Sequence, residues 1–407
     1  MRGWARRIAP GLVVALTIVV VTSPGWLPLS DPRFYQSHDG FEHVFRALAI
    51  ETSLDNGNPL PRWVPELALG FGYPLFAVYS PLSYYPPALL ALAGVDLLSA
   101  VKWDVAALCV ACGLAAYVAG RQFGSRWSGL STAACYACAP YTLANAYIRL
   151  DLAELSTFPL TALAVAALVR IDRGDHTEHA SSTTNVALDA TLLAVPLALL
   201  PATHSLSALI FVPTLVAITV SLLIGSLRSR RDRNRMLLTM GMAAVLALGL
   251  SAWFLLPALR WQGWLRLTSL QSDSHFLPKL VNVRDLVTSV GRWQPSGWYP
   301  GRSDLWTWSL APGPFGELPV SVAYGPLAAA IASAALCIRV TALRKYVVAF
   351  WVAALVSVAF ATTWSSAFWT TFPRLTQVQF PWRVLGPVSL NISLLAGLCT
   401  CLLYTSD

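Results

Sequence analysis

The chain has 407 residues, of which 56% are hydrophobic and only 12% are charged. Soluble globular proteins usually carry about 25% charged residues, so this composition excludes an ordinary soluble enzyme and indicates a membrane protein. The formal charge of +8 at pH 7 does not indicate a nucleic-acid partner, because the basic residues lie in short loops between hydrophobic segments, where membrane topology accounts for them.

Ten hydrophobic segments are long enough to cross a bilayer, which takes roughly 17–25 residues in a helix. Their centres lie near Val14, Ala111, Cys138, Leu163, Val195, Pro213, Ala244, Ala329, Ala354 and Leu394. The first segment has the basic start and apolar run of a signal peptide, but no small-residue cleavage site follows it, so we expect it to be retained. The sequence therefore predicts an all-α polytopic membrane protein with about ten transmembrane helices.

The basic residues agree with this topology. Arg2, Arg6 and Arg7 precede the first helix and place the N-terminus in the cytoplasm. With ten helices, every later basic cluster also lies on the cytoplasmic side. These clusters are Arg121 with Arg126, Arg170 with Arg173, the run 228–235, and Arg339 with Arg344 and Lys345. We therefore expect a multi-pass protein of the cell membrane.

A further apolar stretch, Phe76–Val95, is interrupted by Pro81, Pro86 and Pro87. If it crossed the bilayer, every later basic loop would lie outside, so we interpret it as a juxtamembrane helix that does not span. The outer side then receives a first loop at 26–98, which contains this helix. A long outer loop follows at 260–319.

Ionisable residues gather just after the first helix. Asp39, Glu42, His43 and Arg46 recur at helical spacing and would share one face of a helix. A carboxylate at Asp39 can act as a general base toward a hydroxyl acceptor. Alternatively, Asp39 caps the helix that follows, since Glu42 stands three residues later. His38, Asp39, Glu42 and His43 together could also hold a divalent metal.

Other ionisable residues fall at the outer ends of predicted helices. Arg149, Asp151 and Glu154 lie at the end of the third helix, His204 at the end of the fifth, and Arg383 just before the last. Helix caps, interfacial anchors and local hydrogen bonds would explain each of them singly. The forked donors of an arginine such as Arg383 are also suited to a lipid-linked phosphate.

These elements together resemble a known pattern: an outer-loop Asp, a juxtamembrane segment rich in Pro and Tyr, an Arg…Glu element, a His, and a late Gln-Phe-Pro-Trp-Arg element at 379–383. The pattern looks like that of the bacterial membrane proteins named after a 6-pyruvoyl-tetrahydropterin synthase-related domain. Those proteins are similar to the GT-C superfamily of polyprenyl-phosphate-dependent glycosyltransferases. The resemblance covers nearly the whole chain and implies one GT-C-like transmembrane domain over residues 1–407.

The resemblance also implies an activity. GT-C enzymes take a sugar from a lipid-phosphate donor on the outer face of the membrane, usually with inversion, and pass it to a glycan, lipid or protein acceptor. By this resemblance, Asp39 is the base or a metal ligand, and Arg383, then Arg149, binds the donor phosphate. Glu154 and His204 would orient substrate or metal. The sequence requires no cofactor, and because this chain has one Asp here rather than Asp-x-Asp, a divalent metal stays an open alternative.

Two other functions stay open. A transporter or lipid flippase would need ionisable residues within the membrane, and Asp104 and Asp189 are the candidates, although both fall near helix ends. A non-catalytic membrane assembly protein would need no active Asp39. The last helix stops at Asp407 without a basic flank, so we also expect the reading frame to be truncated there.

Overall fold

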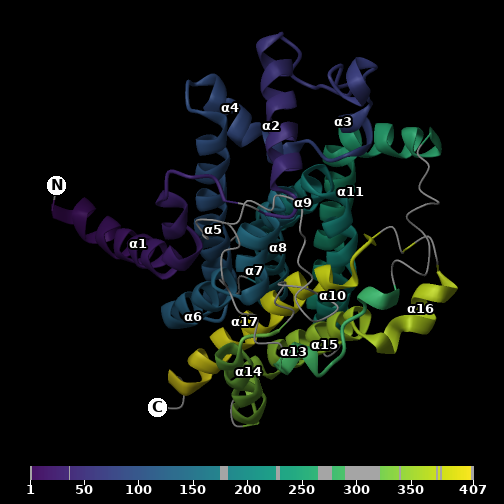
Figure 1. Ribbon diagram of the computed structural model, residues 1–407. Helices are drawn as coiled ribbons and strands as arrows, with labels where there is room; N and C mark the ends of the chain where they lie inside the picture. Colours follow the sequence, from purple (N-terminus) through teal and green to yellow (C-terminus); the bar gives the residue numbers. More distant parts are fainter. Residues whose placement is uncertain are drawn as a thin grey trace.

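A computed structural model of the chain describes residues 2–35, 37–174, 182–225, 230–264, 277–288, 321–338, 341–372, 375 and 378–404. Within these ranges the regular secondary structure is helical, and the β pairing is limited to two isolated bridges. Figure 1 shows the long helices packed into one bundle. The predicted all-α polytopic membrane fold is confirmed.

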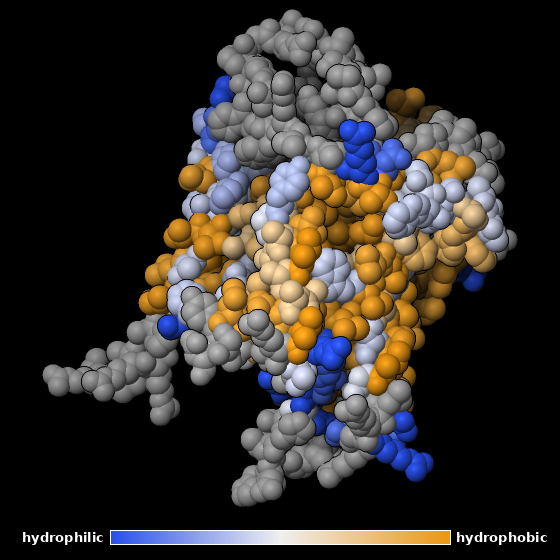
Figure 2. Space-filling model, turned by 90° about the horizontal axis from the view of Figure 1, so that it is seen from below, coloured by the Kyte–Doolittle hydropathy of each residue, from blue (hydrophilic) through white to orange (hydrophobic). Residues whose placement is uncertain are grey.

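Among the described residues, seven helical segments are long and apolar enough to cross a membrane. They belong to α5 (Leu97–Arg121), α8 (Leu152–Arg173), α9 (Ser182–Thr203), α10 (Ser205–Gly225), α11 (Arg230–Trp261), α15 (Arg344–Ala361) and α17 (Leu385–Tyr404). Figure 2 shows a broad hydrophobic surface between two groups of hydrophilic residues, the pattern expected where lipid contacts the protein.

The other three predicted segments are not among these seven. They correspond to α1 (Arg2–Val21), whose side chains are described from Gly11 onward, to α14 (Tyr324–Leu336), and to the pair α6 (Arg126–Ala137) and α7 (Pro140–Ala144). The segment centred on Cys138 is therefore broken rather than one spanning helix. Pro140 causes the break, because a proline lacks a backbone N–H and disfavours helical geometry in the residue before it.

The predicted first outer loop contains three helices, α2 (Gly40–Asp55), α3 (Leu75–Val78) and α4 (Tyr85–Leu92). Figure 1 shows them grouped at one end of the bundle. The predicted juxtamembrane stretch thus holds short helices separated by turns, and Pro86 and Pro87 stand in the first turn of α4, where a missing N–H costs nothing. Most of the predicted long outer loop, 265–276 and 289–320, lies outside the described residues.

Small residues let α5, α6 and α17 approach closely. A Cβ atom added at Gly397 of α17 would lie 2.8 Å from the backbone oxygen of Ser128 in α6, and one at Gly120 of α5 would lie 2.7 Å from the same atom. Close packing around small residues is the usual way for helices to associate in membranes, where the hydrophobic effect between them is weak. Glycines therefore allow the backbones of α5, α6 and α17 to pack in close contact at the core of the bundle.

Candidate functional site

The site is built on an irregular turn between α7 and α8. The π-helical turn η5 (Asn145–Arg149) is followed by Leu150 in a left-handed conformation with φ of 47°. Asp151 then caps α8, because its side chain accepts a hydrogen bond of 2.9 Å from the backbone N–H of Glu154. π-helical turns are frequent at functional sites. This turn gathers Arg149, Asp151 and Glu154 into one small volume.

Arg149 lies at the centre of this turn and is buried. Its guanidinium donates to Glu154 at 2.7 Å, to Asp151 at 2.5 Å and to the Asn145 side chain at 2.9 Å. Burial opposes the charge on Arg149, but Glu154 and Asp151 keep the pKa of Arg149 well above its ordinary value. Such buried pairs need complete hydrogen bonding to offset the loss of water.

The first outer loop is joined to the same turn through backbone hydrogen bonds. The N–H of His38 donates to Ile148 at 2.9 Å, and the N–H of Asp39 donates to Arg149 at 2.8 Å. Gly40 begins α2 against Leu150, and a Cβ atom there would lie 2.8 Å from the Leu150 side chain. A larger residue at position 40 would therefore separate α2 from the turn.

Asp39 precedes α2, but its side chain makes no capping hydrogen bond, so the capping interpretation is wrong. Instead, its carboxylate lies 3.6 Å from the Arg149 guanidinium and is 39% exposed. Partial burial raises the pKa of Asp39 above its usual value, and Arg149 opposes this rise. Asp39 is thus the carboxylate of the cluster that a bound molecule reaches most easily.

Arg383 joins the cluster from a distant part of the chain, 232 positions after Asp151. It belongs to the 3-10 turn η12 (Pro381–Val384) and is 7% exposed. Its Nη2 atom lies 3.5 Å from Asp151, and its Nε atom lies 3.3 Å from Glu154. Among the described residues, Nη1 has no hydrogen-bond partner and Nε has none of adequate geometry. Buried donors are normally satisfied, so Nη1 in particular is a candidate donor to a bound anion.

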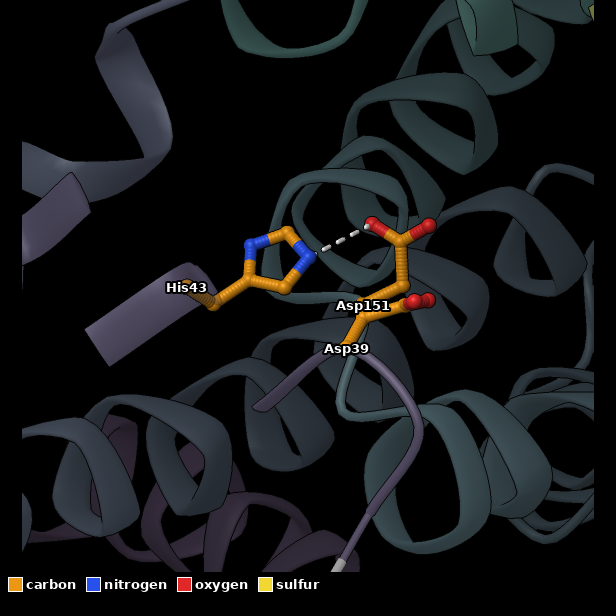
Figure 3. A group of neighbouring side chains, drawn as sticks. All are labelled: Asp39, His43 and Asp151. Atoms are coloured by element: carbon orange, nitrogen blue, oxygen red, sulfur yellow. Dashed lines mark ion pairs between the residues drawn. The ribbon is translucent and has the colours of Figure 1, made fainter. Parts of the chain in front are cut away.

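Two buried histidines border Asp151. The Nε2 atom of His43 lies 3.6 Å from Asp151, and Nδ1 of His204 bonds Ser207 at 2.6 Å. Burial lowers the pKa of each histidine to about 3, although the charge of Asp151 opposes the change. Both rings are therefore neutral at physiological pH. Figure 3 shows the His43 ring directed at the Asp151 carboxylate, with the Asp39 carboxylate beside them.

Asp151 contacts both arginines of the cluster. Burial opposes its ionisation, but the charges of Arg149 and Arg383 hold the pKa of Asp151 well below its usual value. Sequence reasoning placed Asp151 at the end of a helix without assigning it a role. The available signal was its position three residues before Glu154, which is a capping pattern beside an arginine.

The structure brings four of the five predicted substrate and catalytic residues into one contact network: Asp39, Arg149, Glu154 and Arg383. The fifth, His204, lies beside this network, and its ring interacts electrostatically with Asp151, Arg383 and Arg149. It also packs near Tyr79, with ring centroids 6.4 Å apart. Tyr141 joins the network by donating to Glu154 at 2.6 Å.

The predicted metal set is only partly assembled. Among the described residues, ligand atoms of Asp39, His43 and Asp151 lie within 4.8 Å of one another, whereas His38 and Glu42 are not part of this group. Glu42 instead pairs with Arg46 at 2.7 Å and is 66% exposed. His38 lies before the first turn of α2, so helical spacing does not align it with His43. His38 and Glu42 thus lie outside this group.

The similarity of this chain to known proteins lies in its structure rather than its sequence. No protein-family model matches the chain, and no curated protein sequence matches it. Among solved structures, the chain is similar to the crystal structure of the oligosaccharyltransferase of Archaeoglobus fulgidus in the apo form, with a TM-score of 0.46 and 13% sequence identity. The match covers 95% of this chain and 50% of the archaeal chain, so this chain spans about half the length of that protein.

Proposed function

We propose that this protein is a membrane glycosyltransferase that moves a sugar from a polyprenyl-phosphate donor to a glycan, lipid or protein acceptor at the outer face of the membrane. The observation that carries the proposal is the pairing of Arg383, a buried guanidinium with unused donors, with the half-exposed carboxylate of Asp39. One binds an anion and the other accepts a proton, and Arg149 and Asp151 connect them.

The surroundings of Arg383 suit a phosphate that carries an apolar chain. A cavity of about 110 Å³ lies between α10, α15 and α16 (Ser366–Thr371), and Val384, the residue after Arg383, is part of its wall. The other lining residues are Leu209, Ile210, Pro213, Ser357, Phe360, Phe368, Trp369, Leu375 and Val378. An arginine fork recognises phosphate oxygens, and such an apolar wall favours hydrocarbon.

Asp39 supplies the base in this mechanism. As the acceptor oxygen bonds to the anomeric carbon, Asp39 takes the acceptor proton, and the bond from that carbon to the phosphate oxygen breaks. Arg383 and Arg149 stabilise the negative charge that grows on the departing phosphate. A raised pKa makes Asp39 a stronger base than an ordinary aspartate, which favours proton transfer.

A divalent ion fits the same cluster as an optional partner. Two carboxylates and one neutral imidazole, from Asp39, Asp151 and His43, are ligands that such ions accept, and they lie close enough to share one ion. Three carboxylates against two guanidiniums also leave the cluster with excess negative charge. When bound, the ion would supply positive charge to the phosphate.

The transporter alternative depends on Asp189 and Asp104. Asp189 is held by Arg170 at 2.8 Å and Arg235 at 3.2 Å, which ties α9 to α8 and α11 and indicates a structural role. Asp104 of α5 is buried, and among the described residues its Oδ2 atom has no hydrogen-bond partner. Asp104 is thus the residue on which a transport function would have to depend.

Binding of a polyprenyl monophosphate to the purified protein in lipid nanodiscs tests the donor site. Arg383→Gln should weaken binding roughly 10- to 100-fold, because a hydrogen bond to a charged group contributes about 1.5–3 kcal/mol. Arg383→Lys keeps the charge but loses the forked donors, so its affinity should lie between those of the wild type and Arg383→Gln. The matched control is Arg62→Gln, since Arg62 donates to a backbone oxygen of α11 away from the cluster.

Variants of Arg383, Asp39 and Asp104 decide between the functions. Equal affinity of wild type and folded Arg383→Gln would overturn the donor site. Release of labelled sugar from a panel of polyprenyl-phosphate monosaccharides identifies a transferase, because a transporter leaves the bond between sugar and phosphate intact. Movement of intact donor that is lost in Asp104→Asn and kept in Asp39→Asn would favour the transporter.

A further inference from the structure

Tyr84 is completely buried beside the site, and the proposed chemistry gives it no role. Its hydroxyl lies 2.9 Å from Nδ1 of His43 and 3.5 Å from Nη1 of Arg46. The hydroxyl of Tyr79 is also 3.5 Å away. Tyr84 thus links Arg46 to the histidine that faces Asp151.

Arg46 sets the direction of the first hydrogen bond. A guanidinium only donates, so the Tyr84 oxygen accepts from Arg46. Arg46 is itself held in place, because it donates to Glu42 at 2.7 Å and lies over the Tyr79 ring at 4.3 Å. The single hydroxyl hydrogen of Tyr84 is left to point elsewhere, and Nδ1 of His43 is its shortest acceptor.

Asp151 sets the direction at the other end. An ionised carboxylate only accepts, and Nε2 of His43 faces it at 3.6 Å. A bare Nε2 would oppose its lone pair to the lone pairs of the carboxylate. The neutral ring carries one proton, so that proton belongs on Nε2, and Nδ1 is then free to accept from Tyr84.

We propose that Tyr84, oriented by Arg46, is a positioning residue that holds His43 in the tautomer with its proton on Nε2 and aims that proton at Asp151. The N–H and O–H groups then all point the same way: that of Arg46 toward Tyr84, that of Tyr84 toward His43, and that of His43 toward Asp151. The proposal deepens the proposed function, since Asp151 is the carboxylate that aligns Arg149 with Arg383. It also means that a metal bound through Nε2 would require the opposite tautomer.

Nitrogen-15 NMR of the full chain in lipid nanodiscs, labelled at histidine, tests the proposal without substrate. The chain has six histidines, and His43→Gln identifies the signal of His43 by its loss. We expect a protonated Nε2 and a bare, hydrogen-bonded Nδ1 in the wild type. Tyr84→Phe should shift the His43 signals toward a mixture of tautomers, because the donor to Nδ1 is gone.

A matched control is Tyr35→Phe, since Tyr35 is buried but donates to the backbone of Ala146. It should leave the His43 signals unchanged. If Tyr84→Phe does not fold, Arg46→Gln takes its place and should shift the signals in the same direction. A proton on Nδ1 in the wild type, or an unchanged tautomer in the folded variants, would overturn the proposal. The NMR experiment contains no sugar donor, so its result does not depend on whether the proposed transfer reaction occurs.

Discussion

At the scale of single residues, the site depends on carboxylates with different surroundings. Asp151 is buried, accepts from Arg149 and caps α8, whereas Asp39 is 39% exposed and lies 3.6 Å from the same arginine. The Asp151 carboxylate is thus occupied by hydrogen bonds, whereas the Asp39 carboxylate is accessible to a bound molecule. This difference, rather than the number of acids, separates a structural carboxylate from a candidate base.

Asp39→Asn tests the role of the accessible carboxylate. We expect sugar transfer to fall by roughly 10²- to 10⁴-fold, because the amide cannot accept the acceptor proton. The thermal unfolding midpoint should change little, since Asp39 makes no capping hydrogen bond and its closest charged partner is 3.6 Å away. The rate constant of transfer and the midpoint are measured on the same preparation. A folded variant with full transfer activity would show that Asp39 is not the base.

At the scale of elements, interruptions of regular helices create the site. Pro140 ends the run of α6, and the π-helical turn at 145–149 together with Leu150 changes the direction of the chain before α8. An unbroken helix would have carried Arg149 and Asp151 on different faces, because residues two apart do not face each other on a helix. The break allows both to meet in one ion pair.

Gly397→Ala tests the close approach of α17 to α6. The added Cβ would lie 2.8 Å from the backbone oxygen of Ser128, which has no room to move, so we expect a loss of about 1–3 kcal/mol. The measurement is the thermal unfolding midpoint in detergent micelles. Gly241→Ala in α11 is the matched control, because nothing lies within 4 Å of its added Cβ. Its midpoint should stay the same or rise slightly, since alanine favours helix over glycine.

At the scale of the whole molecule, stability should depend on pH through the two buried histidines. Burial lowers the pKa of His43 and His204 to about 3 from a usual 6.5. The unfolded chain then binds protons more readily, so their contribution is complete above pH 6.5 and declines as pH falls toward 3. At pH 5 the loss is roughly 2 kcal/mol for each histidine.

Unfolding midpoints measured between pH 7.5 and pH 5 check this expectation, with roughly half of the histidine-dependent loss absent in His43→Gln. The same change of the unfolding midpoint with pH in the wild type and in His43→Gln would contradict this expectation. The comparison with His43→Gln isolates the histidine, because any other group that titrates in this range does so in both proteins. Asp151 keeps a pKa well below its usual value, so it stays ionised over this range.

The sequence by itself determined the fold class and the approximate place of each helix. Hydropathy acts locally, and a helix in lipid satisfies its own backbone hydrogen bonds, so long apolar runs such as α8 and α10 could be placed without tertiary information. It also indicated Asp39, Arg149, Glu154 and Arg383 as residues of interest, because ionisable side chains are rare in so apolar a chain.

Tertiary structure alone decided which of those residues meet. Arg383 lies 232 positions after Asp151, and their contact depends on how α8 and α17 pack rather than on any local pattern. Packing also excluded His38 and Glu42 from the cluster and brought Tyr84 to His43. Local periodicity describes one helix face at a time, whereas a site formed between elements follows from their contacts, which no single segment of the sequence contains.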